Sequence, residues 1–384
     1  MITFKYRLRP SRSQRTKLIQ TLELCRWVYN ETLATRQQTW EQEKKSLSLY
    51  DTNKLLPAWR QEHPELREVY SQVLQNVQER VDLGFKAFFR RVKAGEKAGY
   101  PRFRGQGRYD SFTFKQFGFN LLENGVFLSK IGTVKIILHR PIEGKIKTLT
   151  LQRDAVGNWY ACFACEVEPE PLPFSDLAIG VDMGLACFAK FSDGKGIENP
   201  RFFHRDEKGL AKAQRKLSKA EKGTPERAKR RRAVQHIHQR IANRRRNFAH
   251  QESRKLVDAF GFLSFEDLRI KNMLQDHRLA KSISDAAWRQ LIQYTTYKAE
   301  NAGRVVVWVE PGNTSQRCSG CGRIVEKSLA VRVHDCPNCG LVMDRDQNAA
   351  INILRLGLES PGYAVEAPAF TALLAQASLG RRRE

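Results

Sequence analysis

Apolar residues in the first hundred positions follow helical spacing after one short strand. Residues 2–8 alternate apolar and polar side chains, as a half-buried strand does. Ser11 can then cap a helix whose apolar residues share one face. Those residues are Leu18, Leu22, Cys25, Tyr29 and Leu33. A second helical period runs through residues 70–93, so the pattern predicts a helical domain over residues 11–100, with a break near Pro57.

The period changes to that of strands between residues 105 and 168. Apolar and polar positions alternate around residues 134–138, and Asn124-Gly125 and Gly157 are turn signals. The pattern indicates several antiparallel strands in a small barrel, which the first strand of the chain could close. The predicted barrel domain comprises residues 1–10 and 101–175.

Strands and helices alternate after Pro169, Pro171 and Pro173, which favours an α/β domain. Buried strands are expected at residues 177–181, 262–266 and 305–309, and a helix near 288–302. We predict that this domain comprises residues 176–311 and 346–356, with one basic helical insertion at about 205–257. From Gly357 onward the pattern dissolves, and residues 357–384 are expected to be a disordered tail.

The charge of the chain points to a polyanionic partner. Its 384 residues include 66 Lys and Arg against 41 Asp and Glu, a net charge of +25. Because the excess is clustered, nucleic acid is the partner that such a field would attract. Two or three domains are expected at this length.

Nothing in the sequence indicates export or membrane insertion. The start lacks the apolar core of a signal peptide, and no stretch approaches the roughly 20 apolar residues that span a bilayer. The eight cysteines suit a reducing compartment. We therefore expect a cytoplasmic, prokaryotic, nucleoid-associated protein.

Four cysteines have the spacing of a zinc site. Cys318 and Cys321 form one C-x-x-C pair, and Cys336 and Cys339 form another after 14 intervening residues. Two such pairs can close a tetrahedral Zn²⁺ site of structural type, so residues 312–345 are predicted to be a zinc-binding insertion. Cys162-Phe-Ala-Cys165 has the same spacing, but its apolar neighbours favour a buried strand.

Three carboxylates stand at strand ends or beside the cysteines. Asp182 and Glu266 follow or end predicted strands, and Asp346 follows the second cysteine pair. Each could be an ordinary turn or helix-start residue. Together they suit hydrolysis of a phosphodiester, in which carboxylates hold two Mg²⁺ ions about 3.5–4 Å apart.

Ordered motifs across residues 1–356 resemble the TnpB family, transposon-encoded RNA-guided DNA endonucleases related to type V CRISPR effectors. The motifs are Phe85-Lys-Ala-Phe-Phe89, Gly99-Tyr-Pro-Arg-Phe-Arg104, Ile179-Gly-Val-Asp-Met-Gly184, Phe265-Glu-Asp-Leu268, Tyr297-Lys-Ala-Glu-Asn-Ala-Gly303, Asn313-Thr-Ser-Gln316, the two cysteine pairs and Asp344-Arg-Asp-x-Asn-Ala-Ala350. The resemblance implies an RNase H-like (RuvC) nuclease domain with a zinc-ribbon insertion. It also implies an N-terminal helical recognition domain and a wedge-like β-barrel.

The resemblance also implies the chemistry and the partners. Asp182, Glu266 and Asp346 match the catalytic, magnesium-binding acids, with Asp344 as a neighbouring acid that leaves the third position open. A guide RNA would select double-stranded target DNA beside a short adjacent motif. The protein is expected to be a monomer on its RNA.

Nucleic-acid contacts are expected in two regions. In the helical domain, polar side chains could reach base edges, and a mixed basic and aromatic loop could hold strands. In the basic insertion, arginines would contact phosphates. The candidates are Tyr50, Gln72, Gln75, Asn76, Lys97, Tyr100, Arg102, Arg104, Arg230, Arg231, Arg244 and Arg245.

Two other functions remain open at this point. The same fold with dead chemistry would be a guided DNA-binding regulator, although all three acidic positions are filled. A DNA-joining transposase could also use an acidic triad, although the zinc insertion between the second and third acids favours the guided nuclease.

Overall fold

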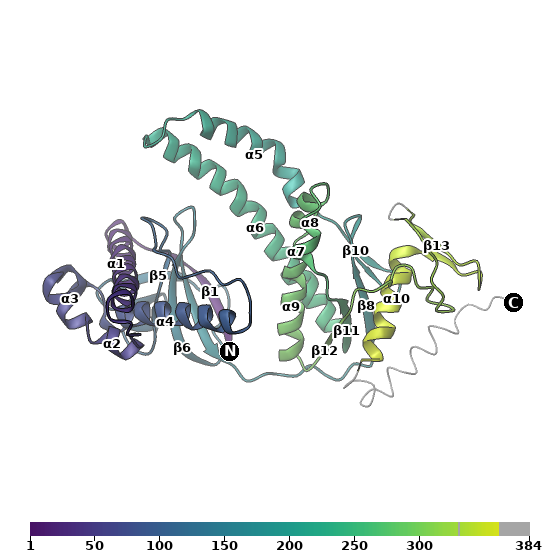
Figure 1. The fold of residues 1–384 in the computed structure, drawn as a ribbon, viewed down its shortest axis with the longest axis horizontal. Coiled ribbons are helices and arrows are strands. Elements are labelled where there is room, and N and C mark those ends of the chain that lie inside the picture. The colour runs from purple at the N-terminus through teal and green to yellow at the C-terminus, as the bar shows by residue number, and fades with distance from the viewer. Residues whose placement is uncertain (329–330, 361–384) are drawn as a thin grey trace. The chain divides into compact units, whose positions relative to one another are not determined.

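The structure is a computed structural model that describes residues 1–328 and 331–360, and the chain divides between Glu168 and Pro169 into two units. Figure 1 shows the helices and strands of both. No helix within the described ranges has both the length and the apolar character that crossing a bilayer requires.

The helices of the first unit begin and end near the predicted positions. They are α1 (Arg12–Glu43), α2 (Leu49–Asn53), α3 (Leu56–Glu62), the 3-10 helix η1 (Pro64–Glu68) and α4 (Ser71–Lys93). Ser11 caps α1 in a reciprocal box, because its hydroxyl accepts from the Gln14 backbone N–H and the Gln14 side chain accepts from the Ser11 backbone N–H. The predicted apolar face of α1 is buried throughout.

The strands of the first unit form one antiparallel seven-stranded sheet. Their bounds are β1 (Ile2–Arg9), β2 (Ser111–Phe114), β3 (Phe119–Leu122), β4 (Gly125–Leu128), β5 (Gly132–Ile137), β6 (Lys145–Arg153) and β7 (Trp159–Glu166). The order is β2-β6-β7-β1-β5-β4-β3, so β1 lies at the centre of the sheet. The rings of Phe114 on β2 and Phe119 on β3 are 6.3 Å apart. The edge strands β2 and β3 of this barrel-like sheet therefore approach each other. The strand β1 does not close the sheet between them, because it lies between β7 and β5.

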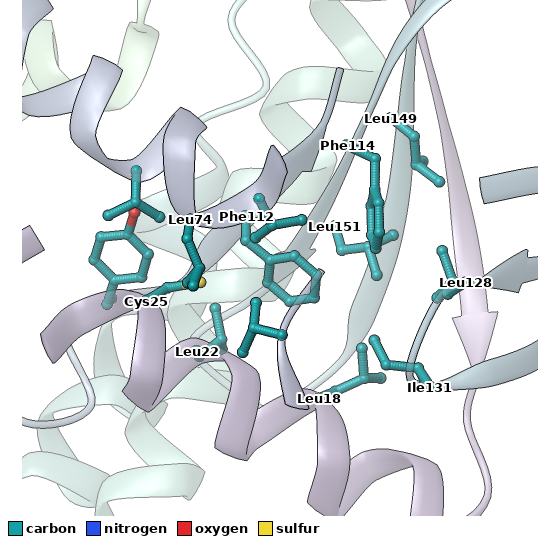
Figure 2. Packing of buried hydrophobic residues seen from close by; sticks show 14 of the residues in the cluster. Leu18, Leu22, Cys25, Leu74, Phe112, Phe114, Leu128, Ile131, Leu149 and Leu151 are labelled. Atoms are coloured by element: carbon teal, nitrogen blue, oxygen red, sulfur yellow. The ribbon is translucent and has the colours of Figure 1, made fainter. Parts of the chain in front are cut away.

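Helices and strands of the first unit share one hydrophobic core. Figure 2 shows Leu18, Leu22 and Cys25 of α1 packed with Leu74 of α4 against Phe112 and other side chains from the sheet. The regions that the sequence analysis assigns to separate helical and barrel domains are therefore joined by common packing.

A five-stranded mixed sheet organises the second unit. Its strands are β8 (Ala178–Met183), β9 (Cys187–Phe191), β10 (Gly196–Glu198), β11 (Phe262–Glu266) and β12 (Val305–Val309), in the order β10-β9-β8-β11-β12. The strands β8, β11 and β12 run parallel, while β9 is antiparallel to β8 and β10 is antiparallel to β9. The carboxyl ends of the three parallel strands therefore meet at one edge of the sheet.

Helices cover both faces of this sheet. They are α5 (Phe202–Lys219), α6 (Pro225–Ala259), α7 (Ile270–Met273), α8 (Ala280–Ala286), α9 (Trp288–Asn301) and α10 (Arg345–Leu358). Leu256 of α6 and Leu291 of α9 pack in one cluster with Val181 and Phe265 of the sheet. The opposite face holds Ile353 of α10. Figure 1 shows α10 on one side of the strands and α9 on the other.

Two boundaries differ from the sequence prediction. The basic insertion is two helices, since Gly223 adopts a φ of +90°, Thr224 caps α6 and Pro225 occupies its first turn. The helix α10 continues through Gly357 to Leu358, because a glycine there lets the helix pack against Ser264. The rest of the predicted tail, residues 361–384, lies outside the described residues.

Candidate functional site

Two of the predicted acids lie side by side at the carboxyl ends of parallel strands. The register pairs Phe265 of β11 with Val181 of β8, so Glu266 and Asp182 are the next residues on each strand. Side chains alternate along a strand, which turns both carboxylates to the face opposite Val181 and Phe265. Ser264 on that face donates a 2.9 Å hydrogen bond to the Ile353 carbonyl of α10. The acids therefore point to the face that α10 covers.

The third acid is on the first turn of α10. Asp344 caps this helix by accepting a 2.9 Å hydrogen bond from the Gln347 backbone N–H, and Asp346 stands two residues later. The helix packs on β8 at very close range, since a Cβ on Gly180 would lie 2.0 Å from the Ala350 carbonyl oxygen. This contact brings Asp346 towards the strand that carries Asp182.

The pKa of Asp182 reflects the burial of its side chain and the carboxylates near it, Asp344 among them. Burial raises the pKa of Asp182 to about 8, and the charges of Glu266 and Asp346 add to the increase, while Arg345 opposes it. Glu266 is 7% exposed, and burial also raises its pKa, against a hydrogen bond from Thr314. These crowded carboxylates, with Arg345 nearby and the Arg332 guanidinium 3.9 Å from Asp346, form a site that a cation would stabilise.

The oxygen donors of this acid cluster suit Mg²⁺, which prefers carboxylates and water. Among the described residues, the acid cluster is not one of the groups whose ligand atoms gather tightly enough for a single metal ion, as those of the four cysteines do. Two ions about 3.5–4 Å apart need a wider set of ligands than one ion does. The donor set therefore suits magnesium, and a Mg²⁺ site here stays a prediction.

The four cysteines converge as the sequence predicts. The sulphur atoms of Cys318 and Cys339 are 3.6 Å apart, as are those of Cys321 and Cys336. Tetrahedral Zn²⁺ with Zn–S bonds of about 2.3 Å would place sulphurs about 3.8 Å apart. The arrangement therefore fits a structural zinc ion.

Both cysteine pairs adopt the same tight turn. The N–H of Gly322 donates to the Cys318 carbonyl at 2.8 Å, and that of Gly340 donates to the Cys336 carbonyl at 2.9 Å. Each glycine has a positive φ, 78° and 71°, which side chains rarely adopt. A hydrogen bond from the Arg323 backbone lowers the pKa of Cys321 to about 6, which favours the thiolate that a metal needs.

The other C-x-x-C pair is not a metal site in this fold. Cys162 and Cys165 are three residues apart on β7, so their side chains lie on opposite faces of the sheet. Cys165 is fully buried in the core of the first unit. The prediction of a core residue is therefore confirmed for Cys165, whereas Cys162 is half-buried.

Two asparagines join the cysteine site to the helix that carries Asp346. Asn348 accepts from the Ser319 N–H at 2.9 Å and donates to the Arg317 carbonyl at 2.8 Å. Asn352, one turn later, donates to the same carbonyl at 2.7 Å. Both are buried, and both bind the carbonyl of the residue that precedes Cys318. Sequence reasoning assigned them no role, although two asparagines four residues apart inside a helix are an unusual choice.

The predicted nucleic-acid contacts of the first unit are partly engaged within the chain. Asn76 bonds Glu79 and Arg80, and Arg80 in turn donates to the Ser111 carbonyl of β2, so this amide serves packing. Tyr50 is 68% exposed and Gln75 is exposed, whereas Gln72 is half-buried. Tyr50 and Gln75 are therefore the candidates of this group that stay accessible.

The loop at residues 97–104 is pinned to α1 while its side chains remain outside. The backbone N–H of Arg104 donates to Asn30 at 2.8 Å, and its carbonyl accepts from Asn30 at 3.0 Å. Lys97, Arg102 and Arg104 are exposed, and Tyr100 is 43% exposed with its edge against Phe85. A fixed loop with accessible cations and an aromatic ring is compatible with the predicted role.

The basic helices α5 and α6 pack side by side as a hairpin, which Figure 1 shows. Near its start, acids neutralise several arginines: Asp206 pairs with Arg240 and Arg244, and Asp285 pairs with Arg245 at 2.7 Å. Asp285 also caps α5 by accepting from the Phe203 N–H at 2.8 Å. The predicted contacts Arg244 and Arg245 therefore hold the hairpin together, and we call this region the hairpin base.

Farther along, the hairpin exposes cations that have no acidic partner among the described residues. We call them the hairpin tip: Lys208, Lys212, Arg215, Lys216, Lys219, Lys222, Lys229, Arg231 and Arg232. Arg230 pairs with Glu226, on its own helix, at 2.6 Å. Of the four predicted arginines, Arg231 thus belongs to the hairpin tip, whereas Arg230, Arg244 and Arg245 each have an acidic partner.

Family comparisons cover most of the chain. Residues 1–45 match a "Helix-turn-helix domain" family, 162–276 a "Probable transposase" family, and 288–353 a "Cas12f1-like, TNB domain" family. The first two are families of the OrfB group of IS605 elements.

Two relatives match nearly end to end. A protein of Streptomyces pristinaespiralis is 35% identical over 92% of this chain and 89% of its own length. The InsQ protein of Escherichia coli strain K12 is 31% identical over 92% of each chain. Both carry the name "Putative RNA-guided DNA endonuclease". A solved complex of Cas12f1 with sgRNA and target DNA covers 92% of this chain and 98% of its own, but its TM-score of 0.36 and 15% identity carry no argument.

Proposed function

Because the chain belongs to the TnpB family of RNA-guided DNA endonucleases, we propose that it cuts double-stranded DNA at a Mg²⁺ site formed by Asp182, Glu266 and Asp346. One observation carries this proposal. Three carboxylates from β8, β11 and α10, far apart in sequence, gather at one edge of a mixed five-stranded sheet.

Each side chain has a distinct part in the proposed chemistry. Bound Mg²⁺ would supply a polarised water and neutralise charge on the leaving oxygen. Asp182 and Glu266, side by side on rigid strands, hold the ligand oxygens in place. Asp346 completes the set from the helix α10, and Asp344 holds the first turn of that helix in its capping role. Zinc on the four cysteines would supply rigidity alone.

The accessible cations support a role for RNA and DNA in positioning this site. We propose that the hairpin tip holds the phosphate backbone of the guide RNA or of the guide–target duplex. Tyr50, Gln75 and the loop at 97–104 are proposed to meet DNA next to the target, where a short adjacent motif would be read. Guide pairing would then select the sequence.

The relatives help to choose between the alternatives. Those that span 92% of this chain are named as RNA-guided endonucleases, which favours a guided nuclease over a DNA-joining transposase. The filled acidic positions favour chemistry over a silent DNA-binding regulator. Cleavage assays separate these outcomes.

The test begins with RNA that co-purifies with the full chain, which is sequenced and used to design a plasmid target. The wild type should linearise this plasmid only with Mg²⁺ and matching RNA. Asp182→Ala, Glu266→Ala and Asp346→Ala should each slow cutting at least about 100-fold, because each removes a proposed metal ligand. The matched control is Asp344→Asn, which keeps a good helix cap and should cut within a few-fold of the wild type.

Three outcomes would contradict the proposal. Cutting by any of the alanine variants at the wild-type rate would remove that residue from the site. Target binding by the wild type without cutting would identify a regulator. Strand joining to a second DNA in place of hydrolysis would identify a transposase.

A further inference from the structure

Thr314 forms a hydrogen bond with one of the three acids of the proposed metal site. It lies between β12 and the first cysteine pair, and it is 7% exposed. Its hydroxyl donates a short hydrogen bond to the Oε1 atom of Glu266, 48 residues earlier in the chain. A hydroxyl that donates to a carboxylate forms a charge-assisted bond, stronger and more directional than one between neutral groups.

The backbone around Thr314 is fixed by the same groups that hold the cysteine site. The Nδ2 atom of Asn352 donates to the Thr314 carbonyl at 2.8 Å and to the Arg317 carbonyl at 2.7 Å. Arg317 immediately precedes Cys318, and its own N–H donates to the Asn313 carbonyl at 2.8 Å. Thr314 thus belongs to a loop that cannot move without moving the first cysteine pair.

We propose that Thr314 is a positioning residue for Glu266, and that the cysteine site affects cleavage through this hydroxyl. The inference rests on the proposed function, in which Glu266 holds Mg²⁺. By binding Oε1, Thr314 fixes the rotation of the carboxylate. Groups that orient metal ligands in this way typically change metal affinity or activity by about 10–100-fold when removed.

Among the described residues, another buried threonine of the same unit bonds only to its own helix and contacts no acid. Thr295 is fully buried in the same unit, but its hydroxyl donates to the Leu291 carbonyl, one turn back on its own helix α9. That bond is local and touches no acid. Thr295→Val is therefore a matched control for the loss of one buried hydroxyl.

The experiment compares Thr314→Val, Thr314→Ser and Thr295→Val in the full chain bound to its co-purified RNA. Two measurements are made on each variant. Mn²⁺ binding is followed by the EPR signal of the free ion and is taken relative to Asp182→Ala on the same RNA. The difference excludes Mn²⁺ bound to RNA phosphates and reports on the acids without any cleavage. The rate of plasmid cutting is then measured as a function of Mg²⁺ concentration.

Thr314→Val should weaken Mn²⁺ binding and slow cutting at limiting Mg²⁺, each by about 10–100-fold. Thr314→Ser keeps the hydroxyl and should restore both to within a few-fold of the wild type. Thr295→Val should leave both unchanged. Each variant should retain one zinc per chain, which shows that the cysteine site is intact.

The outcomes separate this inference from the proposed function. If Glu266→Ala is inactive while Thr314→Val binds Mn²⁺ and cuts normally, positioning by Thr314 is wrong and the nuclease assignment stands. If Glu266→Ala itself binds Mn²⁺ and cuts normally, the proposed site is wrong. Failure of Thr314→Ser to restore binding would also overturn the inference. Should Thr314→Val lose its zinc, Thr314→Ala provides the same comparison without an added methyl group.

Discussion

At the scale of single residues, Gly180 determines how closely α10 can approach the strand that carries Asp182. A Cβ at this position would lie 2.0 Å from the Ala350 carbonyl and 2.7 Å from the Leu354 nitrogen. Backbone atoms cannot rotate away as a side chain can, so the whole helix would have to shift. Asp346 on its first turn would shift with it.

Gly180→Ala is therefore expected to lower both stability and activity. Overpacking of this kind costs about 1–3 kcal/mol, and displacement of a catalytic group by about 1 Å can cost 100-fold in rate. Urea unfolding and plasmid cleavage measure the two effects. The control is Gly209→Ala on the exposed side of α5, where an added Cβ meets nothing within 4 Å. Alanine there should stabilise the helix by about 0.5–1 kcal/mol, and equal effects of both changes would contradict the packing argument.

The candidate metal ligands were predictable from the sequence, whereas the residues that hold them in place were not. Cys318 and its three partners stand in a spacing that few other functions use, and Asp182 and Glu266 end apolar runs. Thr314 stands in the motif Asn313-Thr-Ser-Gln316, but neither its role nor that of Asn352 could be predicted, because their partners lie 48 and 38 residues away. Only the fold brings those atoms together.

At the scale of elements, the long helices of the first unit are held by an ion pair as well as by apolar packing. Asp82 of α4 accepts from Arg36 of α1 at 3.0 Å and pairs with Lys86 at 2.9 Å. The side chains of Asp82 and Arg36 are 8% and 10% exposed, whereas that of Lys86 is 71% exposed. The Arg36 contact is therefore the one that links the two helices.

Asp82→Asn should destabilise the first unit in a pH-dependent way. Burial alone would raise the pKa of Asp82, but Lys86 and Arg36 outweigh it and hold this pKa below its ordinary value. The stabilisation is then complete above the unfolded-state pKa of about 3.9 and is lost as the pH falls through the lower, folded-state value. At neutral pH the variant should lose about 3 kcal/mol, because Arg36 remains buried and unpaired.

Urea midpoints of the wild type and of Asp82→Asn, measured from pH 7 downward, check this expectation. The difference between them should shrink below about pH 4. Lys86→Ala serves as the control, because removal of an exposed partner should cost no more than about 1 kcal/mol. A gap that stays constant with pH would show that packing, and not charge, is responsible.

Periodicity predicted the elements better than their arrangement. The face of α1, the limits of α4 and the strand before Asp182 all follow from spacing. The central place of β1 does not, because alternation reports which face of a strand is buried and not which strands it pairs with. The division between α5 and α6 was available from Gly223-Thr224-Pro225, which together end one helix and begin the next.

At the scale of the whole molecule, the excess of 25 positive charges is unevenly compensated. In the hairpin base, Asp206 and Asp285 form ion pairs with the arginines. Along α5 of the hairpin tip, Lys208, Lys212, Arg215 and Lys219 recur every three or four residues and so lie on one face. This stripe is about 16 Å long. A nucleic-acid strand carries one phosphate per about 3.4 Å of helix axis, so the stripe can contact several phosphates.

This contrast predicts which cations bind RNA. Lys212→Gln, Arg215→Gln and Lys219→Gln combined should weaken binding of the co-purified guide RNA and reduce the salt dependence of its affinity. Three lost phosphate contacts would lower the slope of log K against log salt by about 2–3. Stability should change little, because these side chains are exposed and unpaired within the described residues.

The matched control removes three charges at the hairpin base. The changes are Arg240→Gln and Arg244→Gln on α6 and Lys281→Gln on α8. These residues pair with Asp206 and Glu207, so the control should lower the melting temperature while leaving the salt slope nearly unchanged. Filter binding at several salt concentrations, with thermal unfolding of each variant, measures both quantities. If the salt slope falls by the same amount in both triple variants, RNA binding depends only on the net charge of the protein. If the slope falls only in the tip variant, the arginines of the hairpin base pair with acids and do not contact the RNA.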